Sequence, residues 1–240
     1  MNSKGFVFKS DIPQEWKEIF KNEGKSDCLS YLESAINRII YAIHDLFAYD
    51  YAKDEWGKRQ LKMGEILREK GSVSDKFFLE SRILYCGYEM PYNSFLAKIN
   101  FTFFSSLHSF FDIYGKFLLN IFELDIRNDN IYLIDVVREM EKCSKYKNIA
   151  KKIRDYTRKN EYKYIYDLNN SNKHNKDVSV KSILFIDDGT IDAEIESFKQ
   201  KKKTHPTENM VLKLEDITAF VIDFYDKVTE EVVRTLKMKS

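Results

Sequence analysis

Glycine and proline are scarce in this chain, whose 240 residues contain 8 glycines and 3 prolines. All-β sandwiches use both residues freely in their turns, so this scarcity argues against such folds and favours long helices. An excess of charge of one sign is also absent, because 39 Lys and Arg balance 38 Asp and Glu to a net charge of +1. That balance excludes a uniformly basic, histone-like protein but is compatible with a local basic surface. A hydrophobic content of 43% with 32% charged residues indicates a folded chain rather than a disordered one.

Cysteines with metal-binding or redox spacing are missing. Cys28, Cys86 and Cys143 are widely separated and form no Cys-x-x-Cys motif, which excludes a zinc ribbon and a thioredoxin-type centre. We interpret them as free thiols in a reducing cytosol. P-loop, Gly-x-Gly-x-x-Gly, Gly-x-Ser-x-Gly, His-Glu-x-x-His and EF-hand patterns are absent too. We therefore expect no cofactor, and neither ATP hydrolysis, dinucleotide redox chemistry nor α/β-hydrolase activity.

A long uninterrupted apolar segment is also lacking. Residues 1–10 show no apolar core of a signal peptide. The most apolar stretch, residues 95–122, is interrupted by polar side chains, among them Lys98, Asp112 and Lys116. A bilayer span needs about 20 nearly continuous apolar residues. We therefore expect a cytoplasmic protein with no membrane partner.

Apolar residues at intervals of three and four predict a series of helices. The predicted helices cover residues 12–20, 26–56, 74–84, 92–122, 131–140, 146–172 and 215–238. Residues 58–70 are more polar, and we interpret them as a further helix or an irregular link that ends at Gly71. The segment 92–122 is apolar around most of its circumference, which predicts the longest helix, at the centre of a bundle.

Between Val178 and Ile195 the apolar residues recur at every second position, and Asp188-Gly189 separates two such alternating runs. Asp-Gly in this position is a strong sign of a β-hairpin, which we place at about residues 181–196. The lysine-rich residues 199–203 that follow are interpreted as a polar loop. The sequence therefore predicts an all-α fold: a single helical domain over residues 1–240 with a small β-hairpin insertion before the last helix.

The balanced total charge conceals a basic segment. Residues 141–176 contain eleven Lys and Arg and four Asp and Glu, a local net charge of +7, with five tyrosines interleaved. Basic side chains neutralise phosphates and aromatic rings stack on unpaired bases, so the segment predicts contact with single-stranded RNA. The candidate RNA-binding residues are Lys151, Lys152, Arg154, Arg158, Lys159 and Lys163. The alternative is a solvated helix face whose lysines aid solubility and whose tyrosines pack in the core.

The predicted basic helix ends in an unusual cluster of amides, followed by a lysine and a histidine, over residues 169–174. Residues four apart share a helical face, so Asn170 aligns with His174 and Asn169 aligns with Lys173. Asn169 and His174 are five apart, which separates them by about 140° on the helical wheel. Joint action on one substrate would require an unwound helix end or a second protomer.

This segment, Asn169-Asn170-Ser171-Asn172-Lys173-His174, resembles the Arg-x(4–6)-His signature, often Arg-Asn-x-x-x-His, of the HEPN superfamily. Members of that superfamily are small α-helical bundles of prokaryotic toxin–antitoxin, abortive-infection and CRISPR systems, and many are dimeric, metal-independent endoribonucleases. The resemblance implies a HEPN-like bundle, a homodimer, an RNA ligand, and an antitoxin or defence partner. It also implies His174 as the acid or base and Asn170 as an orienting amide.

One position departs from the HEPN pattern, because the family's arginine falls on Asn169. An amide cannot supply the fixed positive charge that holds a scissile phosphate, although Lys173 could partly replace it. If catalysis survives, His174 would deprotonate a ribose 2′-OH or protonate the leaving oxygen, and a 2′,3′-cyclic phosphate would result. The alternatives are a non-catalytic helical interaction module of a defence system and a structural helical protein. In either of these His174 is an exposed histidine at a helix end, favoured by the helix dipole.

A second group of polar residues lies within the apolar segment 92–122. His108 and Asp112 are one helical turn apart and form part of a polar stripe. They could hold the residues of a neighbouring site in position or form a weak pair of metal ligands, but two ligands alone are too few to bind a metal. The more common explanation is a satisfied polar contact between helices.

Overall fold

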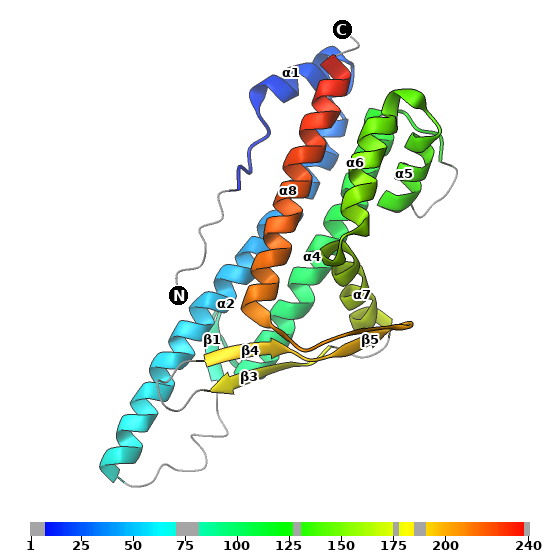
Figure 1. Ribbon diagram of the computed structural model, residues 1–240. Coiled ribbons are helices and arrows are strands. Elements are labelled where there is room, and N and C mark those ends of the chain that lie inside the picture. Colours follow the sequence, from blue (N-terminus) through cyan, green and yellow to red (C-terminus); the bar gives the residue numbers. More distant parts are fainter. Residues whose placement is uncertain (1–7, 71–81, 127–130, 175–177, 185–190, 238–240) are drawn as a thin grey trace. The chain divides into compact units, whose positions relative to one another are not determined.

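The computed structural model describes residues 8–70, 82–126, 131–174, 178–184 and 191–237. Its helices are α1 (Gln14–Asn22), α2 (Cys28–Lys70), α4 (Tyr92–Ile121), α5 (Leu133–Glu141), the short 3-10 helix η1 (Ser144–Tyr146), α6 (Lys147–Arg158), α7 (Asn160–His174) and α8 (Met210–Lys237). Figure 1 shows these helices as the dominant elements, which confirms the predicted predominance of helix. No helix within the described ranges combines the length and apolar character needed to cross a membrane.

In the part of the chain that the structure describes, the strands are short and form three small antiparallel sheets. They are β1 (Arg82–Tyr85), β2 (Tyr88–Pro91), β3 (Val180–Leu184), β4 (Ile191–Ile195), β5 (Phe198–Gln200), β6 (Lys203–His205) and β7 (Glu208–Asn209). β1 pairs with β2, β5 pairs with β6, and β4 lies between β3 and β7. The structure therefore contains more β structure than the single predicted hairpin.

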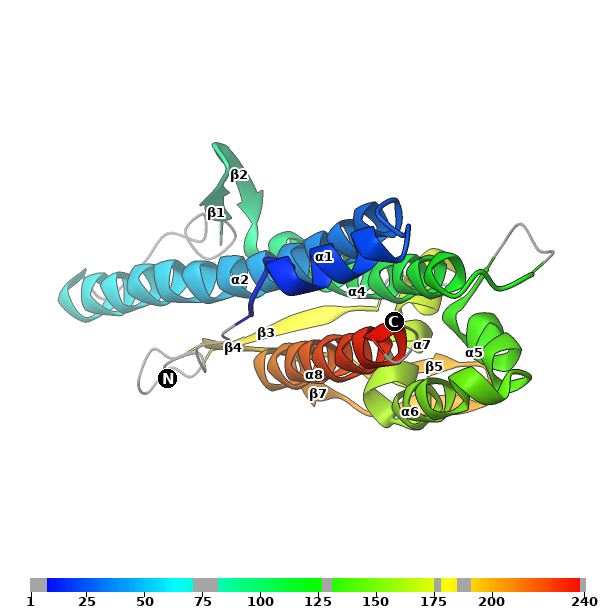
Figure 2. The ribbon, with the colours of Figure 1, turned by 90° about the horizontal axis from the view of Figure 1, so that it is seen from above.

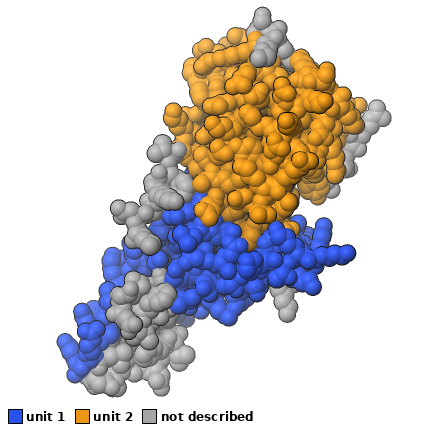
Figure 3. Space-filling model, viewed as in Figure 1, with its two compact units in different colours: residues 1, 43–103, 168–215 blue, residues 2–42, 104–167, 216–240 orange. Residues whose placement is uncertain are grey.

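The chain divides into two compact units, coloured separately in Figure 3. Unit 1 comprises residues 1, 43–103 and 168–215, and it contains all the strands. Unit 2 comprises residues 2–42, 104–167 and 216–240, and its elements are helical. The single domain over residues 1–240 stays a prediction.

The core of unit 2 is a cluster of aromatic rings. Phe224 of α8 lies edge-on to Phe111 and Tyr114 of α4, with ring centroids 5.1 and 5.4 Å apart. The Tyr114 hydroxyl lies 2.9 Å from Oγ1 of Thr229, so a buried polar atom of the cluster has a partner. Gly115 lets α5 approach α4 closely, because a Cβ at that position would stand 3.2 Å from the backbone of Leu133.

The predicted helices at 12–20 and 131–140 are confirmed as α1 and α5, and the helix over 92–122 is confirmed as α4. α4 is not the longest helix, however, because α2 has 43 residues and α4 has 30. For residues 58–70 the sequence predicts either a further helix or an irregular link. In the structure they are helical and continue α2 without interruption. This segment contains no proline and is rich in Lys, Arg, Glu and Leu, which all favour helix.

The predicted helix over residues 74–84 is wrong at its end. Residues 71–81 lie outside the described part, but Ile83 and Leu84 belong to strand β1, which pairs with β2. Cys86 and Gly87 form the two-residue connection with φ of 50° and 82°. Positive φ at both central positions is the requirement of a tight hairpin turn, and glycine meets it without strain.

The predicted helix over residues 146–172 is two helices, α6 and α7, separated at Lys159 by extended backbone with ψ of 153°. A buried tyrosine lies on either side of this break. Tyr156 and Tyr162 are six residues apart and would stand about 120° apart on a continuous helix. The break at Lys159 allows both rings to be buried, each 8% exposed.

The predicted hairpin near residues 181–196 is confirmed as the antiparallel pair β3 and β4, in which Val180 lies opposite Ile195. The expected Asp188-Gly189 turn lies outside the described residues. The predicted loop at 199–203 is instead the tight hairpin of β5 and β6, with Lys201 at a φ of 54°. The last helix begins earlier than expected, at Met210, where the Asn209 side chain accepts a hydrogen bond from the backbone N–H of Leu212 and caps it.

Candidate nucleic-acid interface

The first candidate surface is the solvent side of α6, which belongs to unit 2 and lies beside α5 in Figures 1 and 2. One side of α6 is buried, and its buried residues are Ile149, Ala150, Ile153, Tyr156 and Thr157. The opposite side carries Lys147, Lys151, Arg154 and Arg158, at spacings of four, three and four residues. These spacings place the four side chains within a stripe about 60° wide. We call this set the basic face.

The cations of the basic face differ in their partners. Arg154 forms a forked ion pair with Glu141, with a Nε–Oε1 distance of 3.0 Å. Lys147, Lys151 and Arg158 are exposed and have no ion pair with any residue that the structure describes. Three unpaired cations within three helical turns form a surface that favours a polyanion.

The remaining candidate RNA-binding residues lie outside the basic face. Lys152 pairs with Glu231 of α8 at 3.2 Å and is half-buried. The ammonium of Lys159 lies 4.4 Å from the ring centre of Tyr156, and Lys163 is exposed on α7. Lys147 is not among the residues predicted to bind RNA. The successive spacings of four, three and four residues along Lys147, Lys151, Arg154 and Arg158 could have indicated it, because they place all four on one helix face.

Three of the five interleaved tyrosines are in the core, and the other two, Tyr146 and Tyr166, are half-buried. Tyr156, Tyr162 and Tyr164 are buried, and Tyr146 packs against Phe122 with ring centroids 4.5 Å apart. The Tyr156 hydroxyl donates to a carboxylate oxygen of Asp223 at 2.6 Å, and burial raises the pKa of this phenol. The basic segment therefore exposes charges but not the rings of these three buried tyrosines, and stacking of bases on them is not available in this conformation.

The second candidate surface is the end of α7 in unit 1. His174 and Lys173 are exposed, and Asn170, one turn before His174, is half-buried. Asn169 is 1% exposed, and its side-chain nitrogen has no hydrogen-bond partner among the described residues. The structure therefore brings Asn170, Lys173 and His174 to an accessible helix end and keeps Asn169 inside.

Two of the polar residues in this cluster have structural roles. The Ser171 hydroxyl donates to the side-chain oxygen of Gln200 at 3.2 Å. The side-chain oxygen of Asn172 accepts a hydrogen bond from the backbone N–H of Val178 at 2.8 Å. Both contacts join the end of α7 to the strand region that follows it, and this explains part of the unusual polar composition.

A hollow of about 340 Å³ lies next to this helix end in unit 1. Its lining residues are Ala97, Lys98, Asn100 and Phe101 of α4 together with Asn172 and Val178. Asn100 is buried there, with its side-chain nitrogen 3.5 Å from the carbonyl oxygen of Val178 and its side-chain oxygen without a partner in the described residues. The Phe101 ring is 42% exposed at the same hollow. Lys98 at its wall pairs with Asp45 at 3.5 Å.

His108 and Asp112 of the polar stripe on α4 form a network with Tyr166 of α7 inside unit 2. Nδ1 of His108 lies 3.2 Å from one carboxylate oxygen of Asp112, and the Tyr166 hydroxyl donates to the other at 3.3 Å. Burial and the nearby Tyr162 and Asp112 raise the pKa of Tyr166. The stripe is thus a contact between α4 and α7. Within the described ranges, no group of three or more His, Cys, Asp and Glu side chains could hold a metal ion.

The fold and these surfaces define a mostly helical protein with small antiparallel sheets, one basic helix face, and an accessible histidine at a helix end. No family model, curated protein or solved structure matches the chain. Function is therefore inferred from the residues themselves.

Proposed function

We propose that this protein binds RNA through the phosphates, at the basic face of α6. The observation that carries the proposal is the exposure of Lys147, Lys151 and Arg158 without carboxylate partners in the described part of the chain. When lysine and arginine neutralise phosphates, the counterions condensed on the RNA are released. This release supplies affinity that does not depend on base sequence. Because three of the five tyrosines of the segment are buried and the other two are half-buried, binding depends mainly on charge and shows little preference for base sequence.

Salt dependence tests this function. Three or four phosphate contacts to a single strand give a log–log slope of roughly −2 to −3, so raising the salt from about 50 to 200 mM weakens binding roughly 20- to 50-fold. Fluorescence anisotropy with labelled single-stranded RNAs of several sequences measures both quantities. An affinity that stays constant with salt, or that depends strongly on sequence, would contradict binding through the basic face.

A second candidate function, metal-independent RNA cleavage, is favoured by the exposure of His174 with Asn170 one turn away. This activity is the one that the HEPN resemblance implies. It would require a homodimer in which the α7 ends of two protomers meet at one RNA substrate. The burial of Asn169, at the position of the family's arginine, favours the alternative of a non-catalytic module in a toxin–antitoxin or defence system.

The variant His174→Ala distinguishes cleavage from binding alone. General acid–base catalysis contributes about 100-fold or more, so we expect the variant to lose at least that factor in cleavage rate with EDTA present. His44, exposed on α2, offers the matched control His44→Ala, which should cleave as fast as the original protein. Cleavage that survives in His174→Ala, or that requires Mg²⁺, excludes the mechanism. RNA binding without any cleavage supports the non-catalytic alternative.

A further inference from the structure

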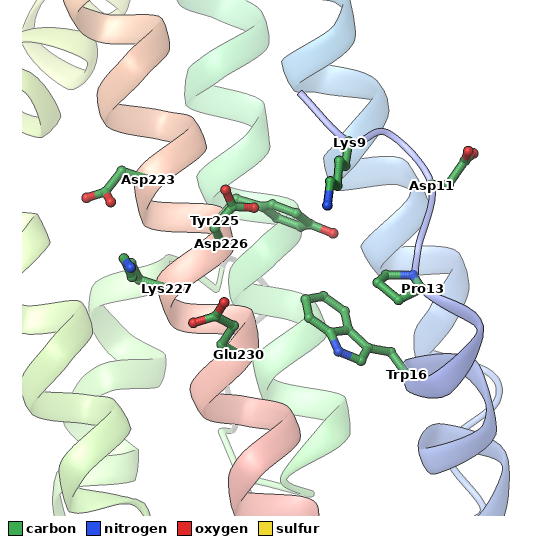
Figure 4. Close-up of a pocket in the computed structure, with 9 residues that line it drawn as sticks. All are labelled: Lys9, Asp11, Pro13, Trp16, Asp223, Tyr225, Asp226, Lys227 and Glu230. Carbon is green, nitrogen blue, oxygen red and sulfur yellow. The ribbon is translucent and has the colours of Figure 1, made fainter. Parts of the chain in front are cut away.

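An acidic cavity lies in unit 2, away from the basic face, between residues 9–16 and one side of α8 (Figure 4). It has a volume of about 440 Å³. Trp16 of α1 and Tyr225 of α8 provide its aromatic surface, and in Figure 4 the two rings point toward one another across the cavity. A cavity with two aromatic walls offers apolar contact and the negative faces of two π systems.

Tyr225 is the first indication that the cavity receives a ligand. The residue is only 3% exposed, yet its hydroxyl has no hydrogen-bond partner among the residues that the structure describes. Figure 4 shows this hydroxyl pointing into the space between Lys9 and Trp16. The ring itself packs against Phe8 in a T-shaped arrangement with centroids 5.7 Å apart. A phenol held in this way presents an acceptor and a donor that only an occupant or solvent satisfies.

The carboxylates of α8 are the second indication. Asp226 and Glu230 lie at i and i+4, so they share one face of the helix about 6 Å apart along its axis. Neither forms an ion pair with a described residue. Like charges at this spacing destabilise a helix. Partial burial, followed by the charges of Glu230 and Asp223, raises the pKa of Asp226, whereas Lys227 and Lys9 lower it.

We propose that this cavity binds a small linear diamine or polyamine, whose ammonium groups pair with Asp226 and Glu230 and whose methylene chain lies against Trp16 and Tyr225. Two ammonium groups joined by four methylenes span about the same 6 Å as the two carboxylates. The ring of Trp16 favours a cation near its face, and the Tyr225 hydroxyl accepts a hydrogen bond from an ammonium. The bound dication removes the repulsion between the carboxylates.

Isothermal titration calorimetry with putrescine tests the pairing, and butylamine, which lacks the second ammonium, is the matched ligand control. We expect saturable binding of one putrescine per chain, and butylamine to bind about ten-fold or more weakly because it leaves one carboxylate unpaired. Putrescine should also change the Trp16 fluorescence, and this change should disappear in Trp16→Phe. Equal binding of the two amines, or displacement of putrescine by an equal concentration of Mg²⁺, would overturn the proposal.

The variants Asp226→Asn and Glu230→Gln test whether these two carboxylates bind the ammonium groups. Each should weaken putrescine binding about ten-fold or more, while Asp216→Asn, an exposed substitution on the same helix, leaves it unchanged. Melting temperatures separate loss of binding from unfolding. The pKa of Asp226 is raised, and a carboxylate with a raised pKa destabilises the folded state when it is ionised. Asp226→Asn should therefore have a melting temperature at pH 7.5 that is no lower than that of the original protein. Unchanged binding in both variants would contradict the assignment.

Discussion

Replacing Phe224 by alanine should lower the free energy of unfolding by about 3–5 kcal/mol. The ring of Phe224 is fully buried at the centre of unit 2. It lies edge-on to Phe110 and Phe111 of α4 and to Tyr156 of α6, with centroids 5.8, 5.1 and 5.3 Å away. The substitution removes apolar contact area and leaves a cavity that the surrounding helices cannot close.

Urea denaturation followed by circular dichroism measures this loss. Phe47→Ala is the matched control, since it makes the same chemical change on α2, where the ring is 50% exposed. An exposed substitution of this kind usually changes stability by less than about 0.5 kcal/mol. If the two variants lose similar stability, the aromatic cluster of unit 2 is not the core that the structure indicates.

The largest functional effect should come from reversing the charge of the basic face. The triple variant Lys147→Glu, Lys151→Glu and Arg158→Glu removes three cations and places three carboxylates beside the phosphates. We expect the affinity for single-stranded RNA to fall on the order of 100-fold at low salt, together with most of its salt dependence. Fluorescence anisotropy over a range of salt concentrations measures both effects. The buried side of α6 is unchanged, so the melting temperature should stay close to that of the original protein.

The chain offers a matched control for this experiment in the hairpin of β5 and β6. Lys199, Lys202 and Lys203 are exposed there, and their replacement by glutamate changes the net charge of the protein by the same amount. RNA binding should be reduced much less in this control. Equal losses in the two triple variants would mean that total charge, rather than the basic face, determines the affinity, and the proposed function would then fail.

Local patterns were sufficient to predict much of the secondary structure. Apolar spacing predicted α4, because the pattern of a helix buried on most sides continues over its whole length. The alternation around residues 180–195 predicted the pairing of β3 with β4. Local patterns failed at Ile83 and Leu84, because a few apolar residues fit both the helical period of about 3.6 and the strand period of two. The tight turn at Cys86 and Gly87 allows these residues to pair as strand β1 with β2.

The candidate sites were predicted only in part. The sequence indicated the density of positive charge between residues 141 and 176, but not which cations remain free. Arg154 and Lys152 are paired with Glu141 and Glu231, and Glu231 is distant from Lys152 in the chain. The burial of Asn169, one residue before the half-buried Asn170, likewise depends on packing that the motif does not contain.

By itself, the sequence determined the helical character of this protein, the β3 and β4 pair, and the location of its local positive charge, because each follows from the order of neighbouring residues. Only the tertiary structure decided that three tyrosines of the basic segment are buried and that three cations of α6 have no ion-pair partner in the described part of the chain. It also brought residues 9–16 against Tyr225, Asp226 and Glu230 to form the acidic cavity. Burial, ion pairing and cavities depend on contacts between residues far apart in the chain, and no local spacing specifies these contacts.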